Sequence, residues 1–397
     1  MQIRQNKKTI GLDALLLAVY FAITPIHQAL LLPNGSTVTK YLAFMVMIVV
    51  LLIAFVFKKD FKFDNRLLNS LAAIVAWFAL GLIYSEARET TLSGIISIVS
   101  YFALMIIVCS KEWTDYEKHL FKLALILACV FYSVTLIEAV ATSKRATFIS
   151  GSTGLEADQN ILAINIGIGY MFALSYFSDA KRVVIKILTL SIALLIIAGV
   201  ICTGSRGALI AIIGTTLYYL FSYTHTSRRL KVWTIVFAVI IFSATMILLN
   251  TDILGNEFVT SRYSSDYEGD FFSGRLEVWA KYFDVLLQMP YGFIIGYGYN
   301  GVSTAYGGYL PATHNDIIHI ICCGGIVAVI LFCRFIRLVW NKASLNKDIL
   351  GKALMILVII GGLSVDSFQR YGWWNAMIFA YIGIGVLSSN GKSKNVQ

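Results

Sequence analysis

The sequence predicts an all-α polytopic membrane protein, and its composition and the length of its apolar runs lead to this fold class. Hydrophobic residues make up 58% of the 397 residues, whereas charged residues make up only 14%. A soluble domain has about 25% charged residues, so this chain lacks the polar side chains that cover a globular surface. These properties exclude an ordinary cytosolic enzyme, a disordered chain and a secreted disulfide scaffold.

The apolar residues fall into runs of the length that a membrane helix needs, about 20 residues. About twelve such runs follow one another, so we expect one transmembrane domain over residues 1–397. The expected spans are 12–32, 39–57, 67–84, 91–109, 120–141, 159–177, 183–202, 207–223, 232–249, 315–332, 349–368 and 372–387. One long connection, residues 250–313, separates spans nine and ten, and its many Tyr, Phe and Gly residues predict an ordered segment.

The distribution of basic residues predicts the orientation, because cytoplasmic connections are enriched in Lys and Arg. With the amino terminus inside, 23 of the 32 Lys and Arg residues fall in cytoplasmic segments and 9 fall outside. Both termini are therefore expected in the cytoplasm, and the 250–313 connection is expected to be extracytoplasmic. The net charge of +10 then indicates orientation and not a nucleic-acid partner.

In this orientation the even-numbered spans begin at the outer surface, where free N–H groups and the helix dipole favour an anion. The segment Thr-Gly-Ser-Arg-Gly at 203–207 precedes the eighth span. Ser205 suits an N-cap, and Arg206 offers a planar cationic group for a phosphate. The alternative is an interfacial arginine whose side chain extends to lipid headgroups.

The long connection contains the segment Ser-Gly-Arg-Leu-Glu-Val-Trp at 273–279. Apolar residues after Arg275 have the spacing of one helical face. These residues are Leu276, Trp279, Ala280, Phe283 and Leu287. We expect a helix that lies on the membrane or on the bundle, and the sharper alternative is that its packing holds Arg275 over a site.

The tenth span begins with Thr-His-Asn-Asp at 313–316. The positive end of the helix dipole disfavours an imidazolium at His314, so a neutral ring there is suited to take a proton from a hydroxyl. A packed histidine is the alternative, and His319 is interpreted as a packing residue or as part of the polar interior of the bundle.

Two further polar sets lie at the same surface. Asp158 and Asn160 begin the sixth span, and Asp366, Gln369 and Arg370 flank the turn before the twelfth. Each set either lines a polar cavity or caps helices, and capping is favoured for the first.

Together these segments resemble the superfamily of O-antigen ligases and O-antigen polymerases. The matching segments are the Gly…Asp-Gln-Asn stretch at 151–160, TGSRGALIA at 203–211, SGRLEVW at 273–279, THNDIIHIICCGGIV at 313–327 and GLSVDSFQR at 362–370. The phosphate-binding arginines of the family fall on Arg206 and Arg275, and its histidine falls on His314. The chain departs from the family pattern at Gln159, where the family usually has proline.

The resemblance implies a multi-pass glycosyltransferase of the bacterial cytoplasmic (inner) membrane that needs no metal and no cofactor. Its implied partners are an undecaprenyl-diphosphate-linked glycan and membrane lipid, with a chain-length regulator as a candidate and no nucleic acid. His314 would be catalytic. The implied substrate-binding residues are Arg206, Arg275, Ser205, Asn315, Asp158, Asn160 and Arg370.

Polymerisation of O-antigen or capsule-type repeat units is favoured, because the GSRGALIA segment and the Gly/Asn-rich stretch before the sixth span resemble polymerases. A ligase that transfers the glycan to lipid A-core is the alternative. A transporter of the same lipid-linked glycans also fits about twelve spans. No internal repeat is visible, however, and the polar residues lie at the outer surface rather than at the midplane, which favours surface chemistry.

Overall fold

A computed structural model describes most of the chain, and all structural statements concern the residues that it describes. These are residues 10–33, 37–56, 61–142, 144, 146–150, 152–154, 156–223, 274–289, 291–299, 301–302 and 312–386. Within them the chain is helical, with two isolated β-bridges and no sheet, which confirms the all-α class. The expected ninth span, 232–249, and most of the 250–313 connection lie outside the described residues.

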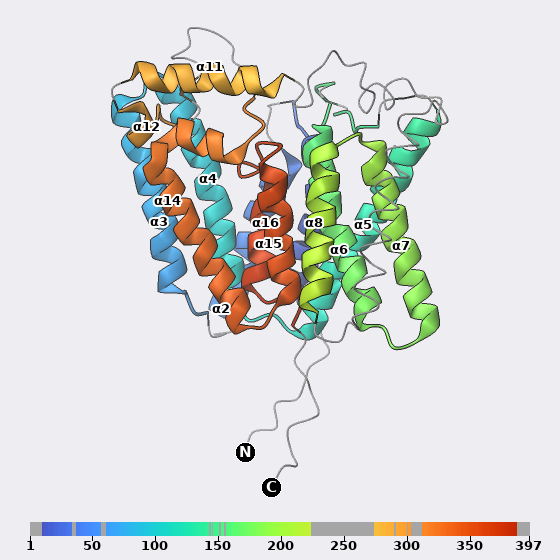
Figure 1. Ribbon diagram of the computed structural model, residues 1–397. Helices are drawn as coiled ribbons and strands as arrows, with labels where there is room; N and C mark the ends of the chain where they lie inside the picture. Colours follow the sequence, from blue (N-terminus) through green and yellow to red (C-terminus); the bar gives the residue numbers. More distant parts are fainter. Residues whose placement is uncertain are drawn as a thin grey trace.

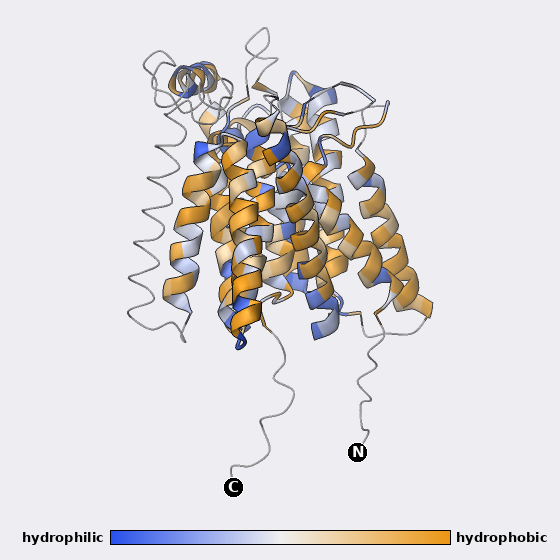
Figure 2. Ribbon diagram, turned by 90° about the vertical axis from the view of Figure 1, so that its right-hand side faces the viewer, coloured by the Kyte–Doolittle hydropathy of each residue, from blue (hydrophilic) through white to orange (hydrophobic). Residues whose placement is uncertain are grey.

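Eleven of the described helices overlap expected spans. They are α1 (Leu12–Ile23), α2 (Val38–Val56), α3 (Asn65–Tyr84), α4 (Arg88–Cys109), α5 (Asp115–Ala141), α6 (Gln159–Asp179), α7 (Val183–Cys202), α8 (Arg206–Ser222), α14 (Asp316–Leu345), α15 (Ile349–Gly362) and α16 (Tyr371–Tyr381). Among them, seven are long and apolar enough to cross a membrane, namely α2 to α7 and α14. Their outward faces are largely apolar (Figure 2), as lipid contact requires.

The helices run between two ends of the bundle, the upper and lower ends of Figure 1. Helix α11 (Arg275–Gln288) lies across the upper end, near the starts of α14 and α16, and the short α12 (Gly292–Ile295) follows it. Helices α3 and α15 begin at the lower end.

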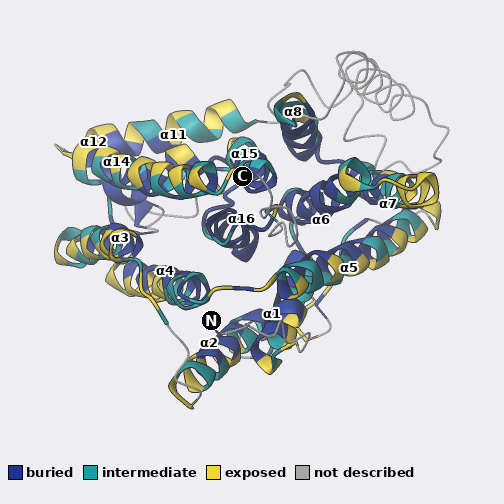
Figure 3. Cartoon of the chain, turned by 90° about the horizontal axis from the view of Figure 1, so that it is seen from below, coloured by how far each residue is buried: buried dark blue, intermediate teal, exposed yellow. Residues whose placement is uncertain are grey.

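Helix α16 is the centre of the bundle, and each of its residues from Tyr371 to Tyr381 is buried (Figure 3). It packs against α4, α6, α14 and α15. Close approach to α6 depends on Gly372, because a Cβ at that position would overlap the Asn165 side chain. Such contacts between small residues are the usual basis of helix association in lipid, where apolar burial alone offers little.

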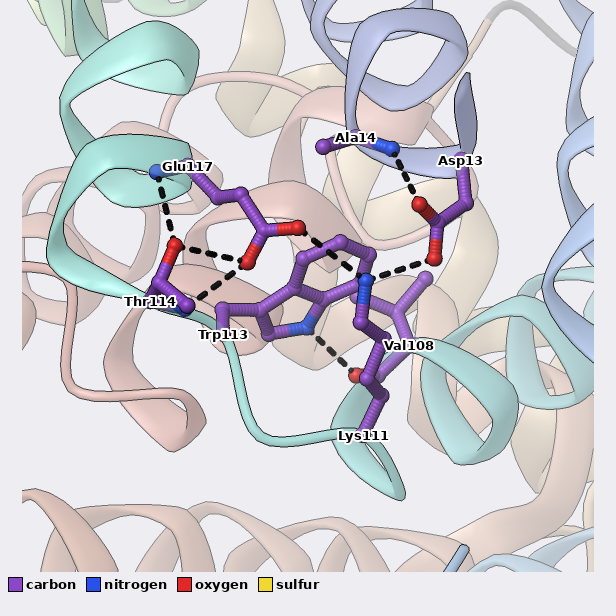
Figure 4. A network of polar contacts seen from close by, with 7 residues as sticks. All are labelled: Asp13, Ala14, Val108, Lys111, Trp113, Thr114 and Glu117. Atoms are coloured by element: carbon purple, nitrogen blue, oxygen red, sulfur yellow. Dashed lines mark hydrogen bonds and ion pairs between the residues drawn. The ribbon is translucent and has the colours of Figure 1, made fainter. Parts of the chain in front are cut away.

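A buried ion-pair network closes the lower end between α1 and the connection from α4 to α5 (Figure 4). The Lys111 ammonium lies 2.5 Å from the Asp13 carboxylate and 3.2 Å from that of Glu117. The same ammonium lies 3.9 Å from the ring centroid of Trp113. Glu117 also forms a capping box with Thr114, which starts α5. Lys111 thus ties the connection after α4 to α1 and to α5.

Helix α14 is interrupted at Gly324 and Gly325, where the backbone leaves helical geometry. Gly325 has φ 65°, and a Cβ there would overlap the backbone of Ile294 in α12. The Gly324 carbonyl, which the break releases, accepts a hydrogen bond of 2.7 Å from the Trp77 indole of α3. Glycine permits this conformation at little steric cost, so the break is specified locally.

Candidate functional site

The candidate site is organised by the turn between α15 and α16, here called the 363–370 turn. Asp366 in this turn is buried and accepts hydrogen bonds from the Thr313 hydroxyl and from the backbone N–H of Asn315, the latter at 3.0 Å. The Asn315 side chain donates in return to the Leu363 carbonyl at 3.3 Å. The start of α14 is therefore fixed to this turn by its backbone and its side chains.

Asp316 makes the reciprocal connection from α14 to the turn. Its buried carboxylate accepts the backbone N–H groups of Ser367, at 2.6 Å, and Phe368, at 3.0 Å. It also accepts the Ser367 hydroxyl at 2.5 Å. Buried carboxyl groups in a membrane segment are costly unless hydrogen bonds satisfy them. The Asp316 and Asp366 carboxylates together form a clamp around the residues that flank His314.

His314 lies inside this clamp with a left-handed backbone, φ 49°. Residues with a Cβ seldom adopt this conformation, and in proteins it concentrates at functional sites. The ring is half-buried, and its Nδ1 atom is buried without a hydrogen-bond partner among the described residues. Buried polar atoms are usually paired, so this nitrogen is suited to accept a proton from a bound group.

Three of the expected site residues cap helices at this end. Ser205 caps α8 by accepting the Ala208 N–H at 3.4 Å, and Asp158 caps α6 by accepting the Asn160 N–H at 2.8 Å. Asn315 caps α14 by accepting the Ile317 N–H at 3.0 Å. The N-cap predictions for Ser205 and Asp158 are confirmed. The side-chain oxygens of these residues satisfy backbone donors of the first helical turn.

Arg206 is the first residue of α8 and is half-buried. The next residue, Gly207, contacts the 363–370 turn so closely that a Cβ would overlap the Ser364 side chain. The structure therefore brings the start of α8 and the start of α14 to the same turn. The segments that carry two expected site residues, Arg206 and His314, are more than one hundred residues apart in sequence and both contact this turn.

Helix α11 is attached to the start of α14 by the Trp279 indole, which donates a hydrogen bond of 2.7 Å to the Thr313 carbonyl. Arg275 is the first residue of this helix and is half-buried. Trp279 follows Arg275 by about one turn, on the same face. The hydrogen bond thus fixes the Arg275 end of α11 beside the His314 segment.

The apolar face predicted for α11 is buried only in part: Trp279 and Phe283 are half-buried and pack against α14 and its neighbours, whereas Leu276, Ala280 and Leu287 are exposed. Leu276 is 50% exposed and Leu287 is 69% exposed. The buried face consists of Tyr282, Val285 and Leu286, which pack with Val302, Ile318 and Cys322. Helix α11 has apolar residues on more than one side. Its contact with α14 decides which side is buried, and the spacing of apolar residues within α11 alone does not predict that side.

Arg370 precedes α16 and is half-buried, and its Nε atom is buried without a hydrogen-bond partner among the described residues. His319, expected either to pack or to belong to the polar interior of the bundle, forms a hydrogen bond with the Gln369 side chain of the same turn. Sequence reasoning missed this pair and the bonds of Asp316 to Ser367. Carboxylates within apolar segments were the available signal, but their partners lie about fifty positions away.

Residues 191–333 of the chain match the family model described as O-antigen ligase. This match supports the O-antigen ligase and polymerase superfamily. The match agrees with the resemblance seen in the sequence, and the family suggests a ligase- or polymerase-type membrane glycosyltransferase as the class of activity. No curated protein matches the chain. The O-antigen ligase match covers about a third of the chain, from α7 into α14, and includes Arg206, Arg275 and His314.

Proposed function

We propose that the protein polymerises undecaprenyl-diphosphate-linked glycan repeats of the O-antigen or capsule type at the outer face of the cytoplasmic membrane. The observation that carries this proposal is the clamped His314. Its backbone is left-handed, its Nδ1 has no hydrogen-bond partner in the described part of the chain, and it lies beside the turn that also contacts the start of α8. The excess of Lys and Arg at the lower end supports an orientation in which this upper end faces outward, with both termini in the cytoplasm.

In the proposed reaction, Arg206 and Arg275 hold the diphosphate of the donor together with the free N–H groups at the start of α8. A hydroxyl oxygen of the acceptor glycan attacks the anomeric carbon of the donor sugar. The bond from that carbon to the diphosphate oxygen breaks, and its electron pair leaves with the diphosphate. The hydroxyl proton passes to Nδ1 of His314. The arginine charges stabilise the departing diphosphate and need no metal.

The other expected residues have supporting roles in this proposal. Ser205, Asp158 and Asn315 position the helix starts, because their side-chain oxygens already accept backbone N–H groups. Asn160 and Arg370 remain to bind the glycan or its phosphates.

The proposal is tested with the purified full chain in detergent and an undecaprenyl-diphosphate-linked repeat as substrate. Longer lipid-linked glycans, resolved by mass spectrometry, are expected from the wild type. His314→Ala is expected to lower the rate by roughly a hundredfold or more, the usual size of general-base catalysis. Arg206→Ala and Arg275→Ala should lower the rate to a similar extent. Arg182→Ala, an exposed arginine before α7, is the matched control. Unchanged rates in all three site variants would refute the proposal.

Transfer to lipid A-core is the second candidate, and the family description as O-antigen ligase favours it. A deletion strain separates the two. Loss of long chains while single repeats still reach the acceptor indicates a polymerase. Long chains that accumulate on undecaprenyl diphosphate indicate a ligase. Formation of a new glycosidic bond in detergent, without a sealed membrane, excludes transport as the sole activity.

A further inference from the structure

A pocket of about 700 Å³ opens between α3 and α14 at the lower end, opposite the candidate site. Its walls come from the first turns of α3, the second half of α14 and the end of α16. The lining residues are Asp64, Arg66, Asn69, Arg334, Arg337, Leu338, Asn341, Lys342, Leu345 and Tyr381. The proposed glycan chemistry uses none of them.

The pocket is strongly cationic. Arg334 and Arg337 are exposed and lie three residues apart, so both project from one face of α14. Arg66 and Lys342 add two further positive charges, and none of the four forms an ion pair with a carboxylate among the described residues.

The one carboxylate of the pocket, Asp64, is already engaged. It accepts the Arg66 backbone N–H at 2.9 Å and that of Leu67 at 3.4 Å as the N-cap of α3, and it accepts the Tyr381 hydroxyl. Since Asp64 serves the backbone and Tyr381, the arginine side chains are left without an anionic group of the protein.

The pocket lies at the level of a membrane surface. Asp64 and Arg66 of the pocket lie at the start of α3, at the lower end of the bundle (Figure 1), and the 20 residues of α3 span about 30 Å. The hydrocarbon core of a bilayer is about 30 Å thick. The pocket therefore lies at the level of one membrane surface, toward which the long side chains of Arg334 and Arg337 extend.

Exposed apolar side chains lead from the pocket toward the membrane interior. On α14, Ile330 is 59% exposed and Ile326 is 48% exposed, and with Cys333 they continue the face of Arg337 at intervals of three and four residues. On the neighbouring α3, Ala76 and Leu80 continue the face of Asn69 in the same manner, and Leu80 is 49% exposed. An acyl chain therefore finds an apolar track on each helix beside a cationic pocket.

We propose that this pocket binds the headgroup of an anionic glycerophospholipid of the leaflet at the lower end. The arginine pair holds the phosphate by charge-assisted, bidentate hydrogen bonds, and the acyl chains lie along α3 and α14. A soluble polyphosphate would satisfy only the cations, whereas a phospholipid satisfies the cations and the apolar tracks. Basic pockets between membrane helices are known places for such headgroups.

The test uses the purified full chain in neutral detergent and fluorescent phosphatidylglycerol as the probe, with phosphatidylcholine for comparison. The wild type is expected to bind phosphatidylglycerol at least tenfold more tightly than phosphatidylcholine. Arg334→Gln/Arg337→Gln is expected to weaken phosphatidylglycerol binding by at least tenfold, since each interfacial arginine contributes roughly fivefold. Arg334→Lys/Arg337→Lys keeps the charge and removes the planar group. Its affinity for phosphatidylglycerol should lie between those of the wild type and of Arg334→Gln/Arg337→Gln.

The matched control is Arg182→Gln/Lys186→Gln, which removes two exposed cations at the start of α7 and leaves the pocket intact. It is expected to bind within twofold of the wild type. Equal loss in both double variants would mean a general charge effect and would overturn the proposal. Full displacement of the lipid by micromolar pyrophosphate at constant ionic strength would also overturn it, in favour of a soluble ligand. A single symmetric peak in gel filtration verifies that each variant is folded.

Discussion

The Asp316 carboxylate receives both the backbone N–H and the hydroxyl of Ser367, two hydrogen bonds that cross 51 positions of sequence. Asp366 in turn accepts hydrogen bonds from Thr313 and Asn315. These bonds fix the residues that precede and follow His314. The position of the histidine is thus set by carboxylates from two different segments.

Asp316→Ala should destabilise the fold by about 1–3 kcal/mol, because it leaves buried N–H and hydroxyl donors of the 363–370 turn without an acceptor. The measurement is the thermal unfolding midpoint in detergent. Asp284→Ala, an exposed aspartate on α11, is the control and should leave the midpoint unchanged. Equal midpoints for the two variants would show that the clamp adds no stability.

Trp279→Phe should reduce glycan transfer by roughly fivefold while the bundle stays folded. The change keeps an aromatic ring but removes the hydrogen bond to the Thr313 carbonyl, and one such bond contributes about 1 kcal/mol. The turnover rate at saturating substrate is the quantity to measure. Trp340→Phe on α14 is the control, and a similar loss in both variants would count against a positioning role for α11.

Gly94→Ala should be destabilising by about 1–3 kcal/mol although alanine favours helices. A Cβ at Gly94 in α4 would overlap the ring of Tyr299, which is only 2% exposed and has no room to move. At Gly214 in α8 the nearest atom to an added Cβ is Ile360 Cδ1 at 3.4 Å, an ordinary contact. Gly214→Ala should therefore be neutral or stabilising. Unfolding midpoints that fall in the reverse order would contradict this packing.

The N-cap of α15 predicts a pH dependence of stability. Burial raises the pKa of Asp348 from 3.8 to about 6, against the opposing hydrogen bonds from the Gly351 and Gly385 N–H groups. The folded state therefore binds the proton more tightly than the unfolded state. This contribution is fully present below pH 3.8 and is lost as the pH rises through 6.

This rise in the pKa of Asp348 corresponds to roughly 2–3 kcal/mol of folding stability. The stability of the wild type minus that of Asp348→Asn should fall by about this amount between pH 4 and pH 7. The difference between the two proteins cancels other titrating groups. A difference that stays constant over this range would show that Asp348 does not titrate in this way.

Periodicity and length predicted the spans well where apolar runs are continuous. The predicted first span, 12–32, is shorter in the structure, because α1 ends at Ile23 and the chain continues as a 3-10 helix over Thr24–Ile26. Pro25 lacks a backbone N–H, which accounts for the change. The predicted eleventh span, 349–368, likewise ends at Gly362, and the remaining residues form the 363–370 turn.

The site was predictable only in part. Local rules identified Ser205 and Asp158 as caps, since an N-cap needs one short polar side chain and its next residues. The left-handed backbone of His314 and the partners of Asp316 depend on contacts between α14 and a turn that is distant in sequence. The face of α11 that is buried depends on the same kind of contact. Spacing within one segment does not contain that information.

The interruption of α14 at Gly324 and Gly325 uncouples the two halves of this helix, one near each membrane surface. A continuous helix would act as a rod, and a rotation at Arg337 would turn His314 with it. Here the backbone ladder is broken, and Trp77 secures the loose carbonyl from a different helix. The orientation of each half of α14 is therefore set by the helices that pack against that half. A ligand bound near Arg337 at one membrane surface then does not reorient His314 at the other.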